Sequence, residues 1–418
     1  MKRPMEILRA YKTELDANNK QRTLLVQCAG VAKFAWNWAL NERVKEYEST
    51  GKSSNAIEQH RQLNTLKSTE YPWLYNYSKC IPQEALRDLD KAYQNFFRRV
   101  KNGSKAPGFP KFKSRKNGIG SFRLTGAIHV TETHIKLPRI GWLRLKEHGY
   151  IPTGGVHILS VTVSESAGRW FVSVQCKQEI ETAQATGEPI GVDLGIKELA
   201  VTSDGQRFKN PKPLKKAQGK LSRLQRELSR RKKGGQNREK TRRKIAKAHQ
   251  RIANIRRDTL HKATTAIVAK SKPDSERPGV IVLEDLNVAG MVKNHCLAQA
   301  ISDVGFAEFR RQLEYKSEWY GSELKIANRF FPSSRLCRYC GCINSELKLS
   351  EREWICDCGA MLDRDLNAAI NLKNLAVRGV PSEQAERQNV CGEDARPVVT
   401  LQAASLKQKP SIESHGRF

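Results

Sequence analysis

The sequence is short of acidic residues and has no long apolar run. Its 418 residues include 74 Lys and Arg but only 43 Asp and Glu, which gives a formal net charge of +31. No apolar run reaches the ~18 residues that a membrane-spanning helix requires, so we expect no membrane partner. The first residues, MKRPMEILRAYKTEL, lack an apolar core followed by a small-residue cleavage site. We therefore expect no signal peptide and a cytoplasmic protein.

The surplus of positive charge indicates a polyanionic partner, with nucleic acid as the first choice. It is concentrated in Gln206–Lys262, where more than twenty Lys and Arg accompany only three acids. We expect two helices joined near Gly234–Gly235. Their thin apolar seams would be Leu221, Leu224 and Leu228, then Ile245, Ile252 and Ile255.

This basic helical hairpin is interpreted as an arm that contacts phosphates. A charge run is more often a solvated helix face, but like charges four residues apart repel, and this run is too one-sided for that alternative. The residues predicted to contact nucleic acid there are Arg230, Arg231, Lys232, Lys233, Arg242, Arg243 and Lys244.

The rest of the chain alternates between β and helical patterns. Met5–Leu15 is predicted to be a strand, and Asn18–Glu48 and Pro82–Lys101 have the periodicity of amphipathic helices. Gly103–Gly118 is a polar, basic linker. From Ser121 to Gln178, short alternating runs separated by turn residues predict an antiparallel β-barrel or small sheet.

Two predicted strands end on carboxylates. In Pro189–Thr202, PIGVDLGIKELAVT, an apolar strand stops at Asp193, and a second apolar strand, Val280–Leu283, stops at Glu284 and Asp285. An Asp followed by a glycine bend is common in ordinary turns, so the first stretch alone does not indicate a site. A desolvated carboxylate is costly unless it meets a cation, which makes a metal the alternative to test.

A third acidic segment, MLDRDLNAAINL, opens a predicted helix with Asp363 and Asp365. If the two strands are neighbours, Asp193, Glu284 and one of this pair converge. Converging carboxylates repel unless divalent cations lie between them, and Mg²⁺ prefers carboxylate and phosphate oxygens. In a strongly basic protein, this set predicts phosphodiester hydrolysis with two Mg²⁺ ions.

The cysteines indicate a metal site and not disulfides. Five of the ten lie between Cys337 and Cys358, in a chain for which no export signal is expected. Cys337-x-x-Cys340 and Cys356-x-Cys358 are each followed by a glycine that permits a tight knuckle turn. Four thiolates leave no open position, so the ion would be a structural zinc. The predicted ligands are Cys337, Cys340, Cys356 and Cys358, with Cys342 as a spare thiol.

The order of three motifs resembles the TnpB family. VDLGIKELAVTSDG is followed by VIVLEDLNVAGM, and then by FFPSSRLCRYCG with CDCGAMLDRDLNAAINL. TnpB proteins are RNA-guided nucleases encoded by insertion sequences and related to type V CRISPR effectors. The resemblance spans about 189–375, and it is looser in YKTELDANNKQ and QEALRDLDKAYQNFF.

The resemblance implies roles for particular residues. Asp193 matches the first catalytic acid, Glu284 the second and Asp365 the third, with Asp363 as the neighbour that could be mistaken for it. Arg364 and Asn367 would lie beside the acids or contact phosphate, while a helix N-cap role is the plain alternative for either Asp. The same resemblance suggests that Lys79 and Gln83, one helical turn apart, contact the target-adjacent motif, although a solvent-facing pair is as plausible.

The resemblance also implies a multidomain α+β architecture and a set of partners. The expected parts are a wedge β-barrel (1–16 and 119–185), a helical recognition domain (17–118), an RNase H-like RuvC nuclease domain (186–331 and 361–380), an inserted zinc ribbon (332–360) and a disordered tail (381–418). The partners would be a guide RNA from the element's own end and double-stranded target DNA, with one protein copy per RNA. A prokaryotic protein associated with the nucleoid while on DNA is expected.

Two other functions fit part of this pattern. A nucleic-acid-binding regulator of transposition without cleavage would use the same scaffold, but it would not need three intact acidic motifs. A general basic RNA-binding ribbon protein explains the charge and the cysteines and leaves the carboxylates without a role.

Overall fold

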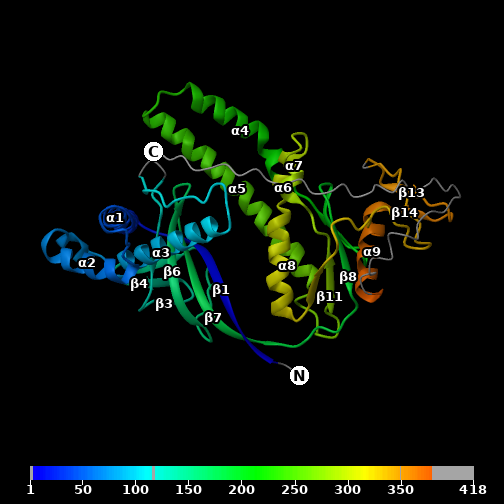
Figure 1. The fold of residues 1–418 in the computed structure, drawn as a ribbon, viewed down its shortest axis with the longest axis horizontal. Coiled ribbons are helices and arrows are strands. Elements are labelled where there is room, and N and C mark those ends of the chain that lie inside the picture. Colours follow the sequence, from blue (N-terminus) through cyan, green and yellow to red (C-terminus); the bar gives the residue numbers. More distant parts are fainter. Residues whose placement is uncertain (1–2, 115–117, 349, 379–418) are drawn as a thin grey trace, which may run out of the picture.

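The computed structural model describes residues 3–114, 118–348 and 350–378. They form two lobes, one built on a seven-stranded sheet and the other on a five-stranded sheet (Figure 1). Within these ranges, every helix is too short or too polar to cross a membrane. The predicted disordered tail, 381–418, lies outside the described residues.

The first lobe is organised around its N-terminal strand. The strands are β1 (Arg3–Asp16), β2 (Ser121–Leu124), β3 (His129–Val130), β4 (His134–Leu137), β5 (Gly141–Leu145), β6 (His157–Ser166) and β7 (Arg169–Thr182), in the order β2-β6-β7-β1-β5-β4-β3. β1 pairs with β7 from Arg3 opposite Thr182 to Leu15 opposite Trp170. The predicted first strand and the antiparallel region that follows are therefore confirmed. Among the described residues the hydrogen-bonded order is that of a sheet, and its closure into a barrel stays a prediction.

Helices α1 (Asn19–Thr50), α2 (Ala56–Thr69), the 3₁₀ helix η1 (Pro72–Asn76) and α3 (Cys80–Lys101) lie between β1 and β2 in the chain. The start of α1 follows from its sequence, because Asn18 and Gln21 form a reciprocal capping box, and Gly51 ends the helix with φ 67°. Leu25, Leu63 and Ile81 from these helices share one hydrophobic core with the sheet. The proposed boundary between the helices and the sheet stays a prediction.

The second lobe has a mixed sheet. Its strands are β8 (Ile190–Leu194), β9 (Glu198–Thr202), β10 (Arg207–Lys209), β11 (Val280–Leu283) and β12 (Glu323–Ile326), in the order β10-β9-β8-β11-β12. β10, β9 and β8 are antiparallel neighbours, while β8, β11 and β12 run parallel. Because both faces are covered by helices, β11 reads as the unbroken apolar run Val-Ile-Val-Leu.

Helices cover both faces of this sheet. The helices of the lobe are α4 (Pro213–Arg230), α5 (Gln236–Ile267), α6 (Val288–Met291), α7 (Ala298–Val304), α8 (Phe306–Tyr320) and α9 (Arg364–Arg378), of which α5, α8 and α9 supply the packing described next. Leu260 of α5 and Phe309 of α8 pack with Ile281 on one face, and Leu372 of α9 packs with Val282 on the other. Figure 1 shows α8 and α9 on opposite sides of β8 and β11.

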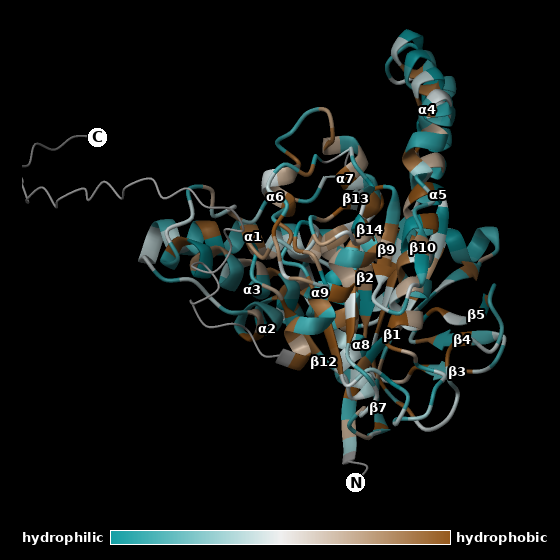
Figure 2. Ribbon diagram, turned by 90° about the vertical axis from the view of Figure 1, so that its right-hand side faces the viewer, coloured by the Kyte–Doolittle hydropathy of each residue, from teal (hydrophilic) through white to brown (hydrophobic). Residues whose placement is uncertain are grey.

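The basic segment forms the predicted helical hairpin, α4 and α5, which projects from the body and is mostly hydrophilic (Figure 2). Leu221, Leu224 and Ile252 are buried in its seam. Ile255 was predicted for the same seam, but its side chain is 39% exposed. The buried face of α5 continues from Ile252 to Leu260, and Leu260 packs with residues of α7 and α8. Ile255 does not lie on this buried face.

A small β-hairpin completes the lobe. β13 (Glu353–Ile355) pairs with β14 (Met361–Asp363), and β14 leads directly into α9. The cysteine segment and the helix that carries the third acidic cluster are therefore continuous.

Candidate active site, metal centre and nucleic-acid surface

The parallel pairing of β8 and β11 brings the first two acids together. Val192 lies opposite Leu283, and Asp193 and Glu284 each follow one residue later. Alternation along the strands turns Asp193 away from the face of Val192, and turns Glu284 to the same side as Val282. That side of the sheet is the one covered by α9.

Gly191 allows α9 to approach the sheet closely. A Cβ atom on Gly191 would lie 2.0 Å from the Ala369 carbonyl oxygen and 2.5 Å from the Lys373 amide nitrogen. Only glycine fits under the helix at this point. Because Asp193 is two residues along the same strand, this contact places its carboxylate near the N-terminal turn of α9.

The two acids of the third cluster have different surroundings. Asp363 accepts a hydrogen bond from the Leu366 amide at 2.9 Å and pairs with Arg207 at 2.9 Å, which makes it a helix cap. Asp365 lies in the first turn of α9, and its carboxylate raises the pKa of Asp193. The N-cap alternative is therefore realised by Asp363, and Asp365 is the acid of this pair whose charge acts on Asp193.

The electrostatics indicate a carboxylate cluster with unbalanced negative charge. Burial, then repulsion from Glu284 and Asp365, raises the pKa of Asp193 well above its usual range, while Arg364 and Arg352 oppose the shift. Burial also raises the pKa of Glu284, against a hydrogen bond from Ser333 and the charge of Arg364. Such a set of oxygen donors fits a hard divalent cation.

The carboxylates are close enough to interact but are not tightly gathered. Within the described ranges, only the four predicted cysteines bring three or more ligand atoms within 4.8 Å of one another. Asp365 is held by Arg352, whose Nη1 lies 3.0 and 3.2 Å from its two carboxylate oxygens. The neighbouring carboxylate of Asp285 is used in two ion pairs, with Arg310 at 3.1 Å and with Arg329 at 2.6 Å.

The four cysteines form a group that could hold a metal ion. Cys337 Sγ lies 3.8 Å from Cys358 Sγ, and Cys340 Sγ lies 3.5 Å from Cys356 Sγ. A tetrahedral ion bound by thiolates at ~2.3 Å requires sulfur separations of about this size, so the residues fit zinc. Backbone hydrogen bonding from Cys342 leads the causes that lower the pKa of Cys340 to about 6.

Both knuckles have the turn that the sequence predicted. Gly341 and Gly359 adopt φ of 78° and 82°, and their amides donate to the carbonyls of Cys337 and Cys356 at 2.9 and 2.8 Å. Cys342, predicted as a spare ligand, lies outside the four-thiol group; its carbonyl accepts a hydrogen bond from the Cys337 amide instead.

Asn367 binds the backbone of the cysteine segment, and its expected contact with the acids or a phosphate stays a prediction. It is fully buried, its Nδ2 donates to the Leu336 carbonyl at 2.7 Å, and its Oδ1 accepts from the Arg338 amide at 3.2 Å. Both ends of its amide bond the backbone of the cysteine segment, and the side chain is closed off from solvent. Arg364 does act on the acids, since its charge lowers the pKa of Asp193 and Glu284.

Three residues around the acids were not found from the sequence. Ser333 donates a hydrogen bond to Glu284, Arg352 holds Asp365, and Asn371 holds the loop that contains Ser333. A serine and an arginine in a loop give no distinctive pattern. The sequence did contain one signal: Asn367 and Asn371 lie four residues apart in the apolar stripe of α9. A buried amide needs hydrogen-bond partners, so this pair indicates a polar segment packed against the helix.

The residues of the basic hairpin that were predicted to contact nucleic acid are nearly all exposed. Arg231 is the partly exposed exception; it pairs with Glu227 and donates to the Asn237 carbonyl at 2.6 Å. Arg242 and Arg243 both pair with Glu239. The exposed residues are Arg230, Lys232, Lys233, Arg242, Arg243 and Lys244.

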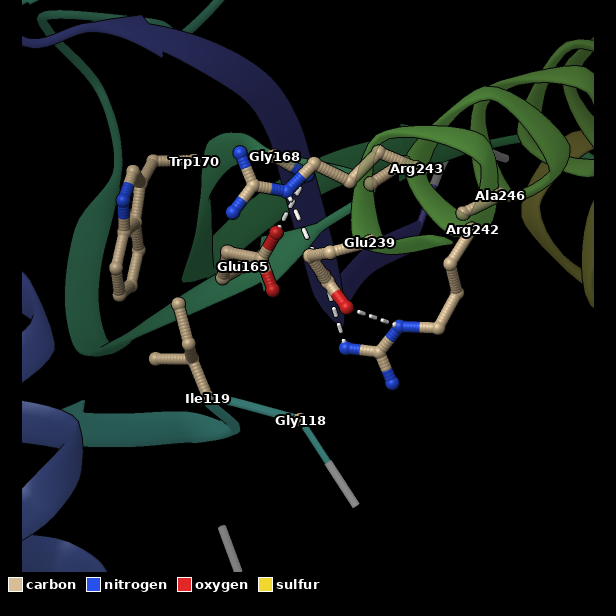
Figure 3. Close-up of a pocket in the computed structure, with 10 residues that line it drawn as sticks. Gly118, Ile119, Glu165, Gly168, Trp170, Glu239, Arg242, Arg243 and Ala246 are labelled. Carbon is tan, nitrogen blue, oxygen red and sulfur yellow. Dashed lines mark hydrogen bonds and ion pairs between the residues drawn. The ribbon is translucent and has the colours of Figure 1, made fainter. Parts of the chain in front are cut away.

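A cavity of about 790 Å³ separates α5 from the turn between β6 and β7 (Figure 3). Arg242, Arg243 and Glu239 line it from the helix, and Glu165 and Trp170 line it from the sheet. A second cavity of about 450 Å³ continues along α5. It is lined by Arg169, Lys247, Arg251, Asn254 and Ile255.

The basic residues on this side of α5 follow the helical repeat. Arg243, Lys247 and Arg251 are spaced four apart and therefore share one helix face. The predicted residue Arg243 thus belongs to a longer basic stripe, Arg243, Lys247 and Arg251, that follows the two cavities. Lys79 and Gln83 lie one turn apart at the start of α3, Lys79 exposed and Gln83 partly buried, and their predicted contact stays a prediction.

Three family models match the chain. Residues 161–295 match OrfB_IS605, described as "Probable transposase", and residues 306–372 match the Cas12f1-like TNB domain. Residues 5–52 match a helix-turn-helix domain model, although in the structure they form β1 and one continuous helix, α1. The first match contains the first two acids, and the second contains the four cysteines and Asp365.

Relatives cover nearly the whole chain. A Streptomyces pristinaespiralis protein named "Putative RNA-guided DNA endonuclease" is 36% identical over 424 residues and covers 98% of each chain. An Escherichia coli K12 protein of the same name, InsQ, is 35% identical and covers 88% of this chain and 92% of its own. The fold is similar to that in the cryo-EM structure of a Cas12f1–sgRNA–target DNA complex, with TM-score 0.53, 15% identity, and coverage of 88% of this chain and 99% of the other.

Proposed function

Since the chain belongs to the TnpB family, we propose that it is an RNA-guided DNA endonuclease whose active site is formed by Asp193, Glu284 and Asp365. The observation that supports this site best is the electrostatic coupling of the first acid to the other two across three chain segments. Perturbed carboxylates of this kind gather at catalytic sites. The order β10-β9-β8-β11-β12, antiparallel then parallel, supports an RNase H-like nuclease domain of the RuvC type.

The partners are a guide RNA from the element's own end and double-stranded target DNA beside a short motif. The names of the relatives and the guide RNA and target DNA in the complex of similar fold support them. Target choice would come from guide pairing, while the protein binds backbone and motif. The stripe of Arg243, Lys247 and Arg251 suits the phosphate backbone, and one protein copy would bind each RNA.

The three carboxylates would hold two Mg²⁺ ions, which supply activation of the attacking water and stabilisation of the leaving 3′ oxygen. Asp193 and Glu284 present their carboxylates from adjacent strand ends, so their spacing is set by the rigid sheet. Arg352 pairs with Asp365 in the structure, and it would be free to contact a phosphate when Asp365 serves as a cation ligand. Arg364 reduces the repulsion among the carboxylates. The ribbon cysteines would hold a structural zinc ion.

The test is cleavage of a target plasmid by the protein purified with its element-end RNA. Asp193→Ala, Glu284→Ala and Asp365→Ala should each slow cleavage by at least ~100-fold, because each loses a ligand of the transition-state cations. Asp363→Ala is the matched control. It removes a carboxylate two residues from Asp365 and should keep cleavage within about threefold, since the cap it loses is worth only ~1 kcal/mol of helix stability.

Each outcome has a distinct meaning. Cleavage at the wild-type rate by all four variants contradicts the active site, whereas binding of RNA and DNA by a wild-type protein that does not cleave favours a nucleic-acid-binding regulator. If Asp363→Ala loses cleavage and Asp365→Ala retains it, Asp363 and not Asp365 is the third proposed ligand. Cleavage that proceeds equally well without RNA contradicts guidance and leaves the nuclease in place.

A further inference from the structure

Ser333 makes a hydrogen bond that reaches into the proposed active site. It lies in the loop between β12 and Cys337, with 5% of its surface exposed, and its hydroxyl donates to the Glu284 carboxylate. Across the described ranges, this is the side-chain hydrogen bond that the structure gives to Glu284. A hydrogen bond to a charged acceptor in a buried place fixes the direction of that acceptor.

The backbone around Ser333 is held by α9. Asn371 Nδ2 donates to the Ser333 carbonyl at 2.8 Å and to the Leu336 carbonyl at 2.7 Å. Asn367 Nδ2 also donates to the Leu336 carbonyl, and its Oδ1 accepts from the Arg338 amide. The loop therefore lies against the helix along its whole length from Ser333 to the first knuckle.

The same loop and helix belong to the ribbon. Cys337 lies inside the clamped segment, and Asn367 and Asn371 are 0% and 2% exposed, so their hydrogen bonds are protected from water. On the far side of the ribbon, Arg352 precedes β13 and holds Asp365. Two of the three proposed acids are thus reached by hydrogen bonds or ion pairs from the cysteine segment.

We propose that Ser333 is a positioning residue that orients Glu284 for cation binding, and that Asn371 and the ribbon hold Ser333 in place. This inference rests on the proposed function, because it assigns Glu284 to a cation. It gives the ribbon a role beyond stability, since the four-thiol centre would fix the loop that aims a catalytic carboxylate. Ser333 itself touches neither the substrate nor the cation.

The first test measures Mn²⁺ binding to the full-length protein by electron paramagnetic resonance, in the absence of target DNA. Ser333→Ala should weaken Mn²⁺ binding about 10- to 100-fold, the usual range for losing a partner of a metal ligand. Ser333→Thr keeps the hydroxyl and should restore binding to near the wild-type level. Ser334→Ala, next in the loop and partly exposed, is the matched control and should bind as wild type.

The second measurement separates positioning from general stability. Ser333→Ala should keep its zinc content and its thermal midpoint, and cleavage should need about 10-fold more Mg²⁺ for half-maximal rate. The double variant Ser333→Ala with Asn371→Ala should lose less free energy of Mn²⁺ binding than the two single variants lose in sum. Both changes act through the one contact between Ser333 and Glu284.

The inference would be overturned if Ser333→Ala bound Mn²⁺ as tightly as wild type and needed no more Mg²⁺ for cleavage. Weaker binding that Ser333→Thr fails to restore, or that comes with a loss of zinc, would overturn it as well. Asp193→Ala is measured in parallel. If it loses Mn²⁺ and Ser333→Ala does not, only the positioning role fails; if it binds Mn²⁺ as wild type, the proposed active site itself fails.

Discussion

At the scale of single residues, Lys316 shows what a buried charge does to this protein. It lies on α8, 6% exposed, and its Nζ donates to the His261 carbonyl at 2.9 Å and to the hydroxyls of Thr264 and Thr265 at 2.7 Å. Burial, then the nearby charge of Lys270, lowers the pKa of Lys316 from 10.5 to about 8. These three hydrogen bonds join α8 to α5. Because the side chain is buried, its charged form is less favourable in the folded state than in the unfolded state.

The lowered pKa predicts a definite pH dependence of stability. Below about pH 8, Lys316 is protonated in both the folded and the unfolded state, so it contributes no slope. Between pH 8 and 10.5 the unfolded chain binds more protons, and this residue makes the folded state more stable as pH rises. In urea denaturation, wild type should therefore gain stability relative to Lys316→Met across that window.

The matched control for this prediction is Lys262→Met. Lys262 is exposed on α5 and pairs with Asp258 at 2.8 Å, so Lys262→Met removes a surface ammonium and leaves the buried one of Lys316 in place. The gain in stability between pH 8 and 10.5 should therefore be retained in Lys262→Met and absent from Lys316→Met. A constant difference between wild type and Lys316→Met from pH 7 to 10.5 would contradict the assignment.

At the scale of elements, the contact between β8 and α9 decides where the third acid lies. Gly191→Ala places a Cβ atom 2.0 Å from the Ala369 carbonyl, and backbone cannot move aside as a flexible side chain can. We expect it to destabilise the protein by about 1–3 kcal/mol or more and to reduce cleavage, because α9 and Asp365 are pushed from the sheet. Thermal denaturation and plasmid cleavage measure the two effects.

Gly30 provides the control within the same chain. It lies inside α1, and a Cβ atom there would meet nothing within 4 Å. Gly30→Ala should stabilise the protein by roughly 0.5–1 kcal/mol, since alanine favours the helix. If Gly191→Ala behaves like Gly30→Ala, the close approach of α9 to the sheet is refuted.

At the scale of the whole molecule, the formal charge is +31, and Arg243, Lys247 and Arg251 on one face of α5 are part of it. Replacing Arg243, Lys247 and Arg251 with Ala should weaken RNA and DNA binding and lower the salt slope, log Kd against log salt concentration. The slope should fall by about 0.7–0.9 for each phosphate that the variant no longer neutralises. The control set, whose residues are exposed and lie outside α5, removes the same charge from Lys45, Lys52 and Lys272. An equal fall in slope for both sets would refute a localised phosphate-binding stripe.

The sequence predicted those features that depend on local pattern. The strand ends at Asp193 and Glu284, the knuckle glycines and the α4–α5 hairpin all follow from periodicity and turn chemistry within short windows. What local pattern could not resolve depends on tertiary contacts. Asp363 and Asp365 differ through Arg207 and Arg352, which come from other parts of the chain.

The exposure of Ile255 and the burial of Asn367 were missed for the same reason. Ile255 has the right spacing for the helical seam, but the packing partner of α5 changes from α4 to α7 and α8 before that residue. Asn367 is a polar residue in a helix, and only the ribbon backbone beside it explains why it is buried. Periodicity identifies the face of a helix and does not identify the partner that covers it.

The long pairing of β1 with β7 has a consequence for translation. The ribosome releases Arg3–Asp16 early, but the partner residues Arg169–Thr182 follow more than 150 residues later. At the usual rates of synthesis the nascent strand waits roughly 10–30 s without its neighbour. The helices made in that interval can pack on one another, but the core that they share with the sheet cannot form until β7 has been made. The first lobe must therefore fold late, and an mRNA truncated before the codons for β7 would yield a chain with an unpaired, aggregation-prone strand.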